Sequence, residues 1–157
     1  MLDCVWGLLV FSYKHGANAP SAKRACPKGA VAISYKLLKE MQDFTQLSVW
    51  QKAHNLTINV YKLTKNLPAE ERFGLTSQIR RCCISIESNL AEGCGRDGDK
   101  EFARFVDISM GSSFELRCQL LIARDLGYID SNQYQLFESK ILEVNRMLGG
   151  LLKKLRA

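Results

Sequence analysis

No proline follows Pro68 in this chain of 157 residues. Proline interrupts a helix because it lacks a backbone N–H and its ring clashes with the preceding turn. Apolar residues make up 46% of the chain and charged residues 24%, which is ordinary for one soluble domain with its own core. The long proline-free stretch therefore favours long helices over a loop-rich or all-β fold.

Apolar residues recur at spacings of three and four from Val49 onward, which predicts an amphipathic helix. Ser48 and Gln51 predict a capping box at its start, and Leu67-Pro68 predicts its end. The expected inner face of this first helix consists of Val49, Ala53, Leu56, Val60, Leu63 and Leu67.

A second helix is predicted from about Leu75, and Gly93 with Gly95 is expected to stop it. Its inner face would be Leu75, Ile79, Cys82, Cys83, Ile86 and Leu90. The acidic stretch 97–99 opens a third helix at the favourable end of its dipole. The inner face of this third helix would be Phe102, Val106, Ser109, Ser113, Leu116, Leu120 and Ala123.

The stretch 126–128 closes the third helix, and Asp130 with Gln133 predicts the cap of a fourth. The fourth inner face would be Tyr134, Phe137, Ile141, Val144, Leu148, Leu151 and Leu155. Four helices with short connections and no strand signal predict an all-α fold, an antiparallel up-and-down four-helix bundle in residues 41–157.

Residues 1–40 lack this periodicity and are expected to be an irregular or misannotated N-terminal extension, with Met41 as the start of the domain. The apolar run 4–13 is too short to span a membrane as a helix. It resembles the apolar part of a signal peptide, but the residues before it carry no positive charge, which argues against that role. Four of the six cysteines lie in or at the end of helical patterns, where free cysteine acts as a small apolar residue. A reducing, cytoplasmic location without membrane contact is therefore expected.

The third helix carries more apolar surface than one core needs. Val106, Met110 and Phe114 form a second stripe that continues to Cys118. The small residues at 110–113 would let another backbone approach closely. The stripe predicts a subunit interface, with a wider contact inside the bundle as the alternative.

Catalytic and metal chemistry find little support in the helical region. Cys82 and Cys83 diverge by about 100° on a helix, and Cys94 lies about 17 Å along the axis from them, so the three cannot share a metal ion. Gly93-Cys94-Gly95 follows a helix, whereas phosphate-binding glycines follow a strand. His54 alone does not make a catalytic set. We expect no enzyme activity, no cofactor and no metal.

A polar stripe remains on the second helix, formed by Arg81, Ser85, Ser88 and Glu92 with Asn89 beside it. Across the turn, Arg96, Lys100 and Arg104 repeat every four residues and extend it as a basic ridge. Two interpretations stay open: a phosphate-binding face, or a solvated face with intrahelical ion pairs. Bulk charge does not decide between them, because only +2 of the net charge of +6 lies in residues 41–157.

Three blocks of the sequence carry a family resemblance: LSVWQKAHNLTINVYKLTKNLP, ERFGLTSQIRRCCISIESNLAEGCGR and EFARFVDISMGSSFELRCQLLIARDLGYI. Together they resemble the four-helix-bundle proteins encoded in intervening sequences of bacterial 23S rRNA genes, from about Leu47 to the C-terminus. The resemblance implies a homopentamer around a central axis. It also implies kinship with the accessory bundle protein of diversity-generating retroelements, which associates with a reverse transcriptase and nucleic acid. It implies no defined biochemical activity.

The chain departs from the family pattern where Cys82, Cys83 and Cys94 stand in place of small residues. Glu87 replaces a proline or small residue, and its charge would weaken a phosphate face. The positions carried over by the resemblance are Gln78, Arg80, Arg81, Ser85, Asn89, Glu92, Gly93 and Arg96.

The sequence and the resemblance together predict a non-enzymatic, oligomeric binding protein. Its expected ligand is structured RNA, either rRNA or intervening-sequence RNA, bound through the polar and basic face of the second and third helices. The alternative is a scaffold that docks a protein partner such as a reverse transcriptase. A hydrolase built on Glu92 and Asn89 ranks lowest, because no complete catalytic set accompanies them.

Overall fold

The computed structural model describes residues 43–157, so the predictions for residues 1–40 and for Met41 lie outside the described residues. The long helices are α3 (Ser48–Leu63), α4 (Leu75–Cys94), α5 (Asp99–Asp125) and α6 (Ser131–Leu155). Three short 3-10 helices, η1 (Phe44–Gln46), η2 (Thr64–Asn66) and η3 (Ala69–Arg72), flank or connect α3 and α4. Residues 43–157 contain no strand, which confirms the all-α prediction.

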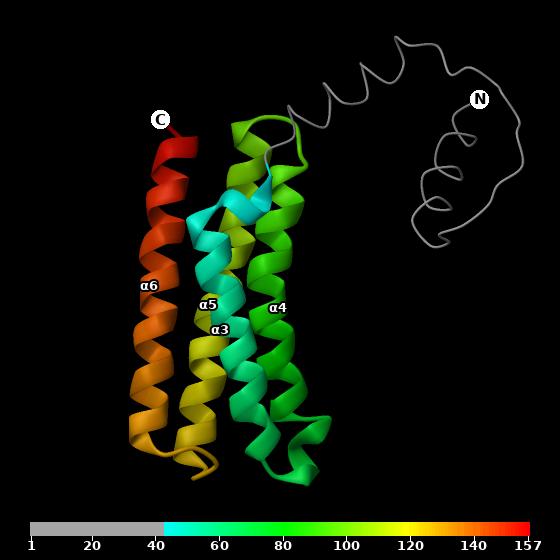
Figure 1. Cartoon of the computed structure of the whole chain (residues 1–157), viewed down its shortest axis with the longest axis vertical. Coiled ribbons are helices and arrows are strands. Elements are labelled where there is room, and N and C mark those ends of the chain that lie inside the picture. The colour runs from blue at the N-terminus through cyan, green and yellow to red at the C-terminus, as the bar shows by residue number, and fades with distance from the viewer. Residues whose placement is uncertain (1–42) are drawn as a thin grey trace, which may run out of the picture. The chain divides into compact units, whose positions relative to one another are not determined.

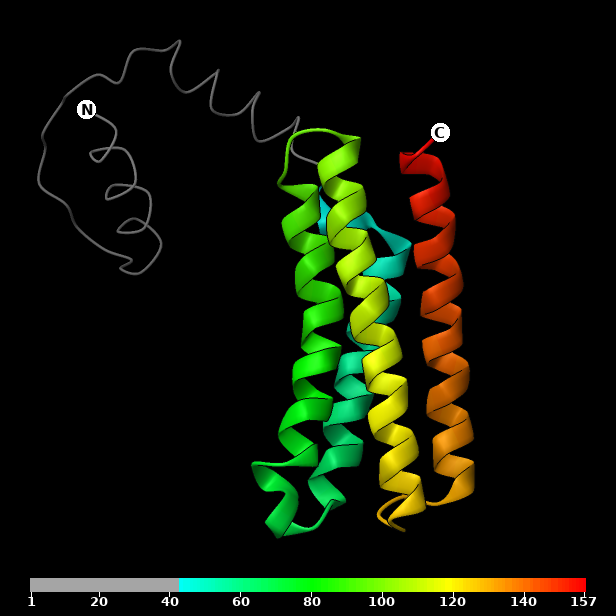
Figure 2. The ribbon, with the colours of Figure 1, turned by 180° about the vertical axis from the view of Figure 1, so that it is seen from behind.

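The four long helices lie side by side and form a bundle (Figures 1 and 2). Helix α3 packs against α4 and α6, and α5 packs against the same two helices from the other side. The chain colours in Figure 1 run down α3, up α4, down α5 and up α6. Each helix therefore has two neighbours and turns one face toward a shared interior.

The shared interior is built from the predicted apolar faces. Val60, Ile79, Ile86, Leu116 and Ile141 have no exposed surface at all. The match fails only at the ends: Leu67 and Leu75 are half-buried, and in α6 Leu152 is buried in place of Leu151 and Leu155. The last shift follows from the 3.6-residue period, because a step of four from Leu148 keeps the side chain nearer the core than a step of three.

One predicted capping box is present and the other is absent. Asp130 accepts a hydrogen bond from the Gln133 backbone N–H at 2.7 Å, and Gln133 accepts one from the Asp130 N–H at 2.9 Å. The box at Ser48 and Gln51 was predicted wrongly, since Ser48 is already the first helical residue. The Gln51 amide instead donates to the Thr45 carbonyl at 2.9 Å, because η1 leads the chain directly into α3.

Gly93 does not stop α4, as the sequence had suggested. It lies inside the helix and is buried, and the helix ends at Cys94 with Gly95 as its C-cap. The φ of Gly95 is −89°, a conformation open to any residue. A Cβ at Gly93 would lie 2.6 Å from Cδ2 of Phe102 and 2.9 Å from Cβ of Phe105, so glycine is needed there for the close approach of α5.

Within residues 43–157, no helix combines the length and the apolar character that crossing a membrane requires.

Candidate nucleic-acid interface

The polar groups predicted to face solvent on α4 lie partly in the contact between α4 and α5. The hydroxyl oxygens of Ser85 and Ser112 are 2.8 Å apart across that contact. Asn89 donates from its amide to the Ser85 carbonyl at 2.7 Å. Ser85 is therefore half-buried at the contact with α5. The Ser85 hydroxyl thus bonds to the neighbouring helix, and the Asn89 amide bonds one turn back within α4, so both groups already have partners.

Most cations of the predicted basic ridge have carboxylate partners. Arg81 contacts Glu115 of α5 at 3.3 Å, and Arg104 lies 3.8 Å from Glu101. Arg96 forms an ion pair with Glu92, and its guanidinium lies 5.2 Å from the centre of the Phe105 ring. Lys100 is exposed, and no ion pair is found for it among the described residues. Arg96 and Arg104 thus have local ion pairs and Arg81 has one between helices, and these acidic partners compete with phosphate for the three cations.

Gln78 and Arg81 bond on the α5 side of α4, whereas Arg80 bonds on the α3 side. The Gln78 side chain accepts a hydrogen bond from Nε of Arg81 at 3.1 Å, on the side that faces α5. Arg80 lies on the side of α3, where its Nε donates to the Thr64 hydroxyl at 2.8 Å. Its guanidinium carbon lies 4.9 Å from the centre of the Tyr61 ring. Adjacent residues diverge by about 100° on a helix, so the two arginines contact different neighbouring helices, although both line the same surface depression.

Two neighbouring surface depressions meet at Arg80, and we call them together the basic groove. One has a volume of about 510 Å³ and the other about 340 Å³, and both are lined by Arg72, Thr76 and Arg80. Lys65 and Arg81 add two more cations to the lining. No carboxylate lines either depression in the part of the chain that the structure describes. The groove is therefore the surface where cations gather without interleaved acids.

The α3–α4 connection shapes the basic groove. Helix η3 carries Arg72 at its end, and Phe73 follows it with 88% of its surface exposed. The nearby carboxylate of Glu71 is used elsewhere: it accepts from the Leu75 N–H at 2.9 Å and from the Tyr128 hydroxyl at 3.3 Å. Glu71 thereby caps the start of α4 and does not line the groove.

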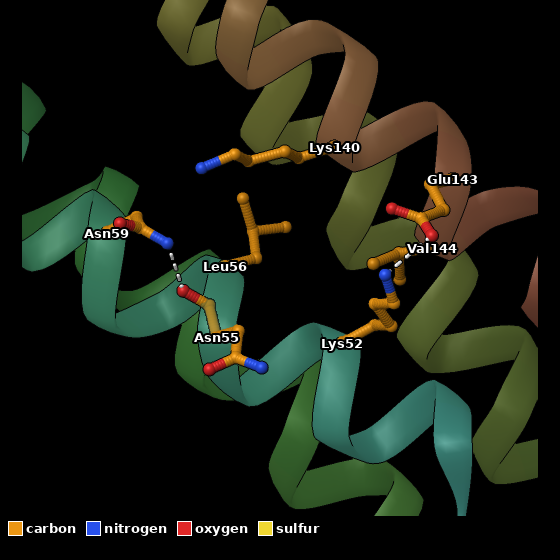
Figure 3. A pocket seen from close by; sticks show the side chains of 7 residues that line it. All are labelled: Lys52, Asn55, Leu56, Asn59, Lys140, Glu143 and Val144. Carbon is orange, nitrogen blue, oxygen red and sulfur yellow. Dashed lines mark hydrogen bonds and ion pairs between the residues drawn. The ribbon is translucent and has the colours of Figure 1, made fainter.

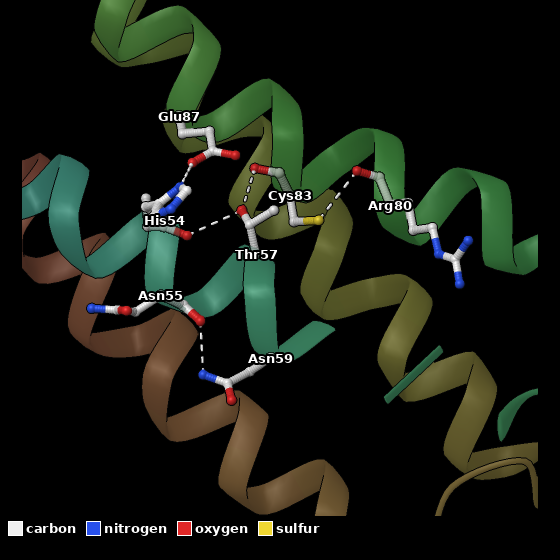
Figure 4. A network of polar contacts seen from close by, with 8 residues as sticks. His54, Asn55, Thr57, Asn59, Arg80, Cys83 and Glu87 are labelled. Atoms are coloured by element: carbon white, nitrogen blue, oxygen red, sulfur yellow. Dashed lines mark hydrogen bonds and ion pairs between the residues drawn. The ribbon is translucent and has the colours of Figure 1, made fainter. Parts of the chain in front are cut away.

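A network of polar contacts joins α3 to α4 (Figure 4). His54 lies 2.9 Å from Glu87 and stacks on Trp50 with ring centres 5.0 Å apart. The Thr57 hydroxyl lies 3.2 Å from the Cys83 carbonyl. His54 is thus an interface histidine. Glu87, which was expected to weaken the phosphate face, instead points toward α3 and is occupied by His54.

The cysteines of α4 are part of the packing. Cys82 and Cys83 are buried, and burial raises the pKa of Cys82 to about 12 and that of Cys83 to about 11. Cys83 also donates its thiol to the Arg80 carbonyl. Within residues 43–157, no group of three or more His, Cys, Asp or Glu side chains is placed to hold a metal ion.

A third depression, between α3 and α6, has a volume of only about 150 Å³ (Figure 3). Lys52 and Glu143 form an ion pair at 2.8 Å across it. The Asn59 amide donates to the backbone carbonyl of Asn55 at 2.7 Å. The polar side chains that line this depression mostly bond to neighbouring groups, so the depression is a weaker candidate for a ligand site than the basic groove.

The predicted interface stripe on α5 is corrected at its first residue. Val106 is 0% exposed and belongs to the core of its own subunit, because it lies on the inner face of α5. Met110 packs partly against the core, whereas Phe114 is 54% exposed and Cys118 is exposed. Ile108 and Ile122 are exposed on the same helix and Leu126 is exposed at its C-cap, although the predicted stripe includes none of them. We call Ile108, Phe114, Cys118, Ile122 and Leu126 the outer face of α5.

Fold and surface together define a four-helix protein with a cationic groove at the α3–α4 connection and an apolar outer face on α5. The family model described as "23S rRNA-intervening sequence protein" matches residues 45–150, which is more than half of the chain. The chain therefore belongs to the 23S rRNA-intervening sequence protein family. The family resemblance found in the sequence is confirmed.

The structure is similar to the crystal structure of a protein of unknown function from the S23 ribosomal protein family of Bacteroides thetaiotaomicron VPI-5482. The TM-score is 0.63 and the sequence identity 24%, over 67% of this chain and 98% of the other. At this identity the similarity establishes the fold. No curated protein matches the chain.

Proposed function

We propose that this protein is a non-enzymatic, oligomeric RNA-binding protein of the cytoplasm. Its antiparallel up-and-down bundle would be the subunit of a ring, a homopentamer by family resemblance. Its ligand would be structured RNA, either rRNA or the intervening-sequence RNA that the family description names. The contact surface would be the basic groove rather than the α4–α5 face.

One observation carries this proposal: Lys65, Arg72 and Arg80 line the basic groove with no carboxylate among the described residues of its lining, and Arg81 adds a fourth cation that also pairs with Glu115 of α5. Arginine forks match the geometry of phosphate oxygens, and phosphate contacts supply most of the affinity of RNA-binding surfaces. On the α4–α5 face, by contrast, Glu92 and Glu101 compete with phosphate for the arginines. A ring would repeat the groove, so modest contacts could add to useful affinity.

The test is the salt dependence of binding to fragments of 23S rRNA that carry the intervening sequence. The variant is Lys65→Ala with Arg72→Ala, which removes two groove cations outside the buried core. It should weaken binding and reduce the slope of log affinity against log salt by about 1.4 to 1.8, or 0.7 to 0.9 per lost phosphate contact.

The matched control is Lys100→Ala with Arg104→Ala, which removes two exposed cations from the predicted ridge on α5. This control should leave the slope unchanged. If the control variant lowers the salt slope and the groove variant does not, the RNA-binding site lies on the α4–α5 face instead. Absence of any RNA binding at low salt would overturn the proposal.

A second candidate is a scaffold that docks a protein partner such as a reverse transcriptase. The outer face of α5 favours it, because an exposed apolar face commonly marks a protein contact. Capture of a defined reverse transcriptase encoded beside this gene, insensitive to ribonuclease and lost in Ile122→Glu, would favour the scaffold over the RNA-binding protein.

A further inference from the structure

Phe73 is the most exposed large apolar side chain among residues 43–157, with 88% of its surface open to solvent. It directly follows η3, before Gly74 and the start of α4. Burying an aromatic ring is favourable, and a ring left outside the core gives no such stabilisation to the fold. Phe73 therefore contributes little to holding this subunit together, and its position needs another reason.

The surroundings of Phe73 are cationic. The Arg72 guanidinium carbon lies 5.5 Å from the centre of the Phe73 ring. Phe73 lines the larger depression of the basic groove together with Arg80 and Arg81. The ring of Tyr61 in the same depression is half-buried and packs against Arg80 at 4.9 Å, whereas Phe73 stays largely exposed beside Arg72 and is the more accessible ring.

An aromatic ring beside several cations is the combination that proteins use for unpaired nucleotides. The cations hold the phosphates, and the ring stacks on a base that has left its helix. A fully paired RNA duplex hides its base faces in the stack and offers only phosphates and sugar hydroxyls to such a surface. Phe73 would thus gain contact from a single-stranded segment and little from a duplex.

We infer that Phe73 is a stacking platform for an unpaired base, so that the basic groove selects single-stranded segments of RNA, such as loops or bulges. This inference rests on the proposed function and names the part of the RNA that the groove takes. Aromatic and arginine side chains also anchor protein partners. Four cations line the groove and only Arg81 among them pairs with a carboxylate of the described residues, so the excess of positive charge favours a polyanion over a protein.

The experiment compares two labelled RNAs of equal length, one a single strand without secondary structure and the other a fully paired hairpin. Fluorescence anisotropy with the full chain gives both affinities at one low salt concentration. Phe73→Ala should weaken binding of the single strand about tenfold or more and leave the hairpin nearly unchanged. Phe73→Trp should restore single-strand binding, because it restores the stacking surface.

Leu136→Ala on α6 is the control, since Leu136 is also a large exposed apolar residue but lies away from the groove lining. It should change neither affinity. Equal losses for both RNAs in Phe73→Ala, or no loss at all, would overturn stacking. If the Lys65 and Arg72 variant still lowers the salt slope in that case, the proposed function stands and only this inference fails. If the wild-type protein binds neither RNA, both the proposed RNA-binding function and the stacking role of Phe73 are wrong.

Discussion

Gly93 of α4 lies directly against the ring of Phe102 of α5. A methyl group at Gly93 would come within 2.6 Å of Cδ2 of that ring and 2.9 Å of Cβ of Phe105, distances that real side chains do not tolerate. Gly93→Ala should therefore lower the free energy of unfolding by about 1–3 kcal/mol, as overpacked cores do. Urea denaturation followed by circular dichroism measures this loss.

Gly149 supplies the matched control, because a Cβ there would meet nothing within 4 Å. Gly149→Ala should stabilise the protein by about 0.5–1 kcal/mol, since alanine is the better helix former. Equal effects at the two glycines would show that Gly93 is not required for the approach of α5.

The outer face of α5 should control assembly. Phe114→Glu with Ile122→Glu places charges on this face, where both native side chains are substantially exposed in the single subunit. Light scattering should change from about five times the subunit mass of 17.7 kDa to the subunit mass itself, while the helical circular dichroism stays the same.

Leu136→Glu with Leu142→Glu makes the same chemical change on α6, where both residues are also exposed. This control should leave the assembly intact. Dissociation by the α6 pair alone would move the subunit contact to α6, and a monomeric wild-type protein would refute the ring.

The thiols of α4 and α5 should react very differently. Cys82 and Cys83 are buried with raised pKa values, so little thiolate forms near neutral pH, whereas Cys118 is exposed. Iodoacetamide at pH 8, followed by peptide mass mapping, should modify Cys118 rapidly in the dissociated variant with Phe114→Glu and Ile122→Glu, where the outer face of α5 is open to solvent. Cys82 and Cys83 should be modified only after denaturation. Fast labelling of either in the native protein would contradict their burial.

These pKa values also predict an alkaline loss of stability. The folded protein keeps the two protons up to about pH 11 for Cys83 and about pH 12 for Cys82, whereas the unfolded chain releases them near pH 9. The unfolded state then binds fewer protons, so stability falls as the pH rises from 9 toward 11. Cys82→Ala with Cys83→Ala should show a smaller fall than wild type in pH-dependent denaturation.

Asn145 is predicted to act as a hydrogen-bond donor inside the contact between α5 and α6. The single hydroxyl proton of Ser113 cannot serve both the Met110 carbonyl at 2.7 Å and the Asn145 side chain. Turning the amide lets Nδ2, a buried nitrogen with no other partner, donate to Ser113. Asn145→Asp should therefore cost about 1–3 kcal/mol of unfolding free energy at pH 7.

Asn132 provides the comparison for that substitution, because it is exposed in the first turn of α6. Asn132→Asp should be neutral or slightly stabilising, since a negative charge is favourable at a helix start. An Asn145→Asp protein as stable as wild type would contradict the donor role. Thermal denaturation of both variants decides the point.

Local periodicity was enough to predict the helices of this protein. The apolar faces of α3 to α6 lie where spacings of three and four placed them, because which residues share a helix face depends only on the helical repeat. The Asp130 cap was predicted for the same reason, since its partner Gln133 is three residues away. The family membership also follows from sequence blocks alone.

Tertiary structure decided everything that depends on a second helix. Ser85 contacts Ser112 and Gly93 lies against Phe102, and neither partner is near in sequence. Arg80 and Arg81 are adjacent in the chain, yet one lies against α3 and the other against α5. The basic groove forms only when η2, η3 and α4 come together. A sequence gives the direction of a side chain around its own helix, but only the packing of the helices decides what that side chain meets.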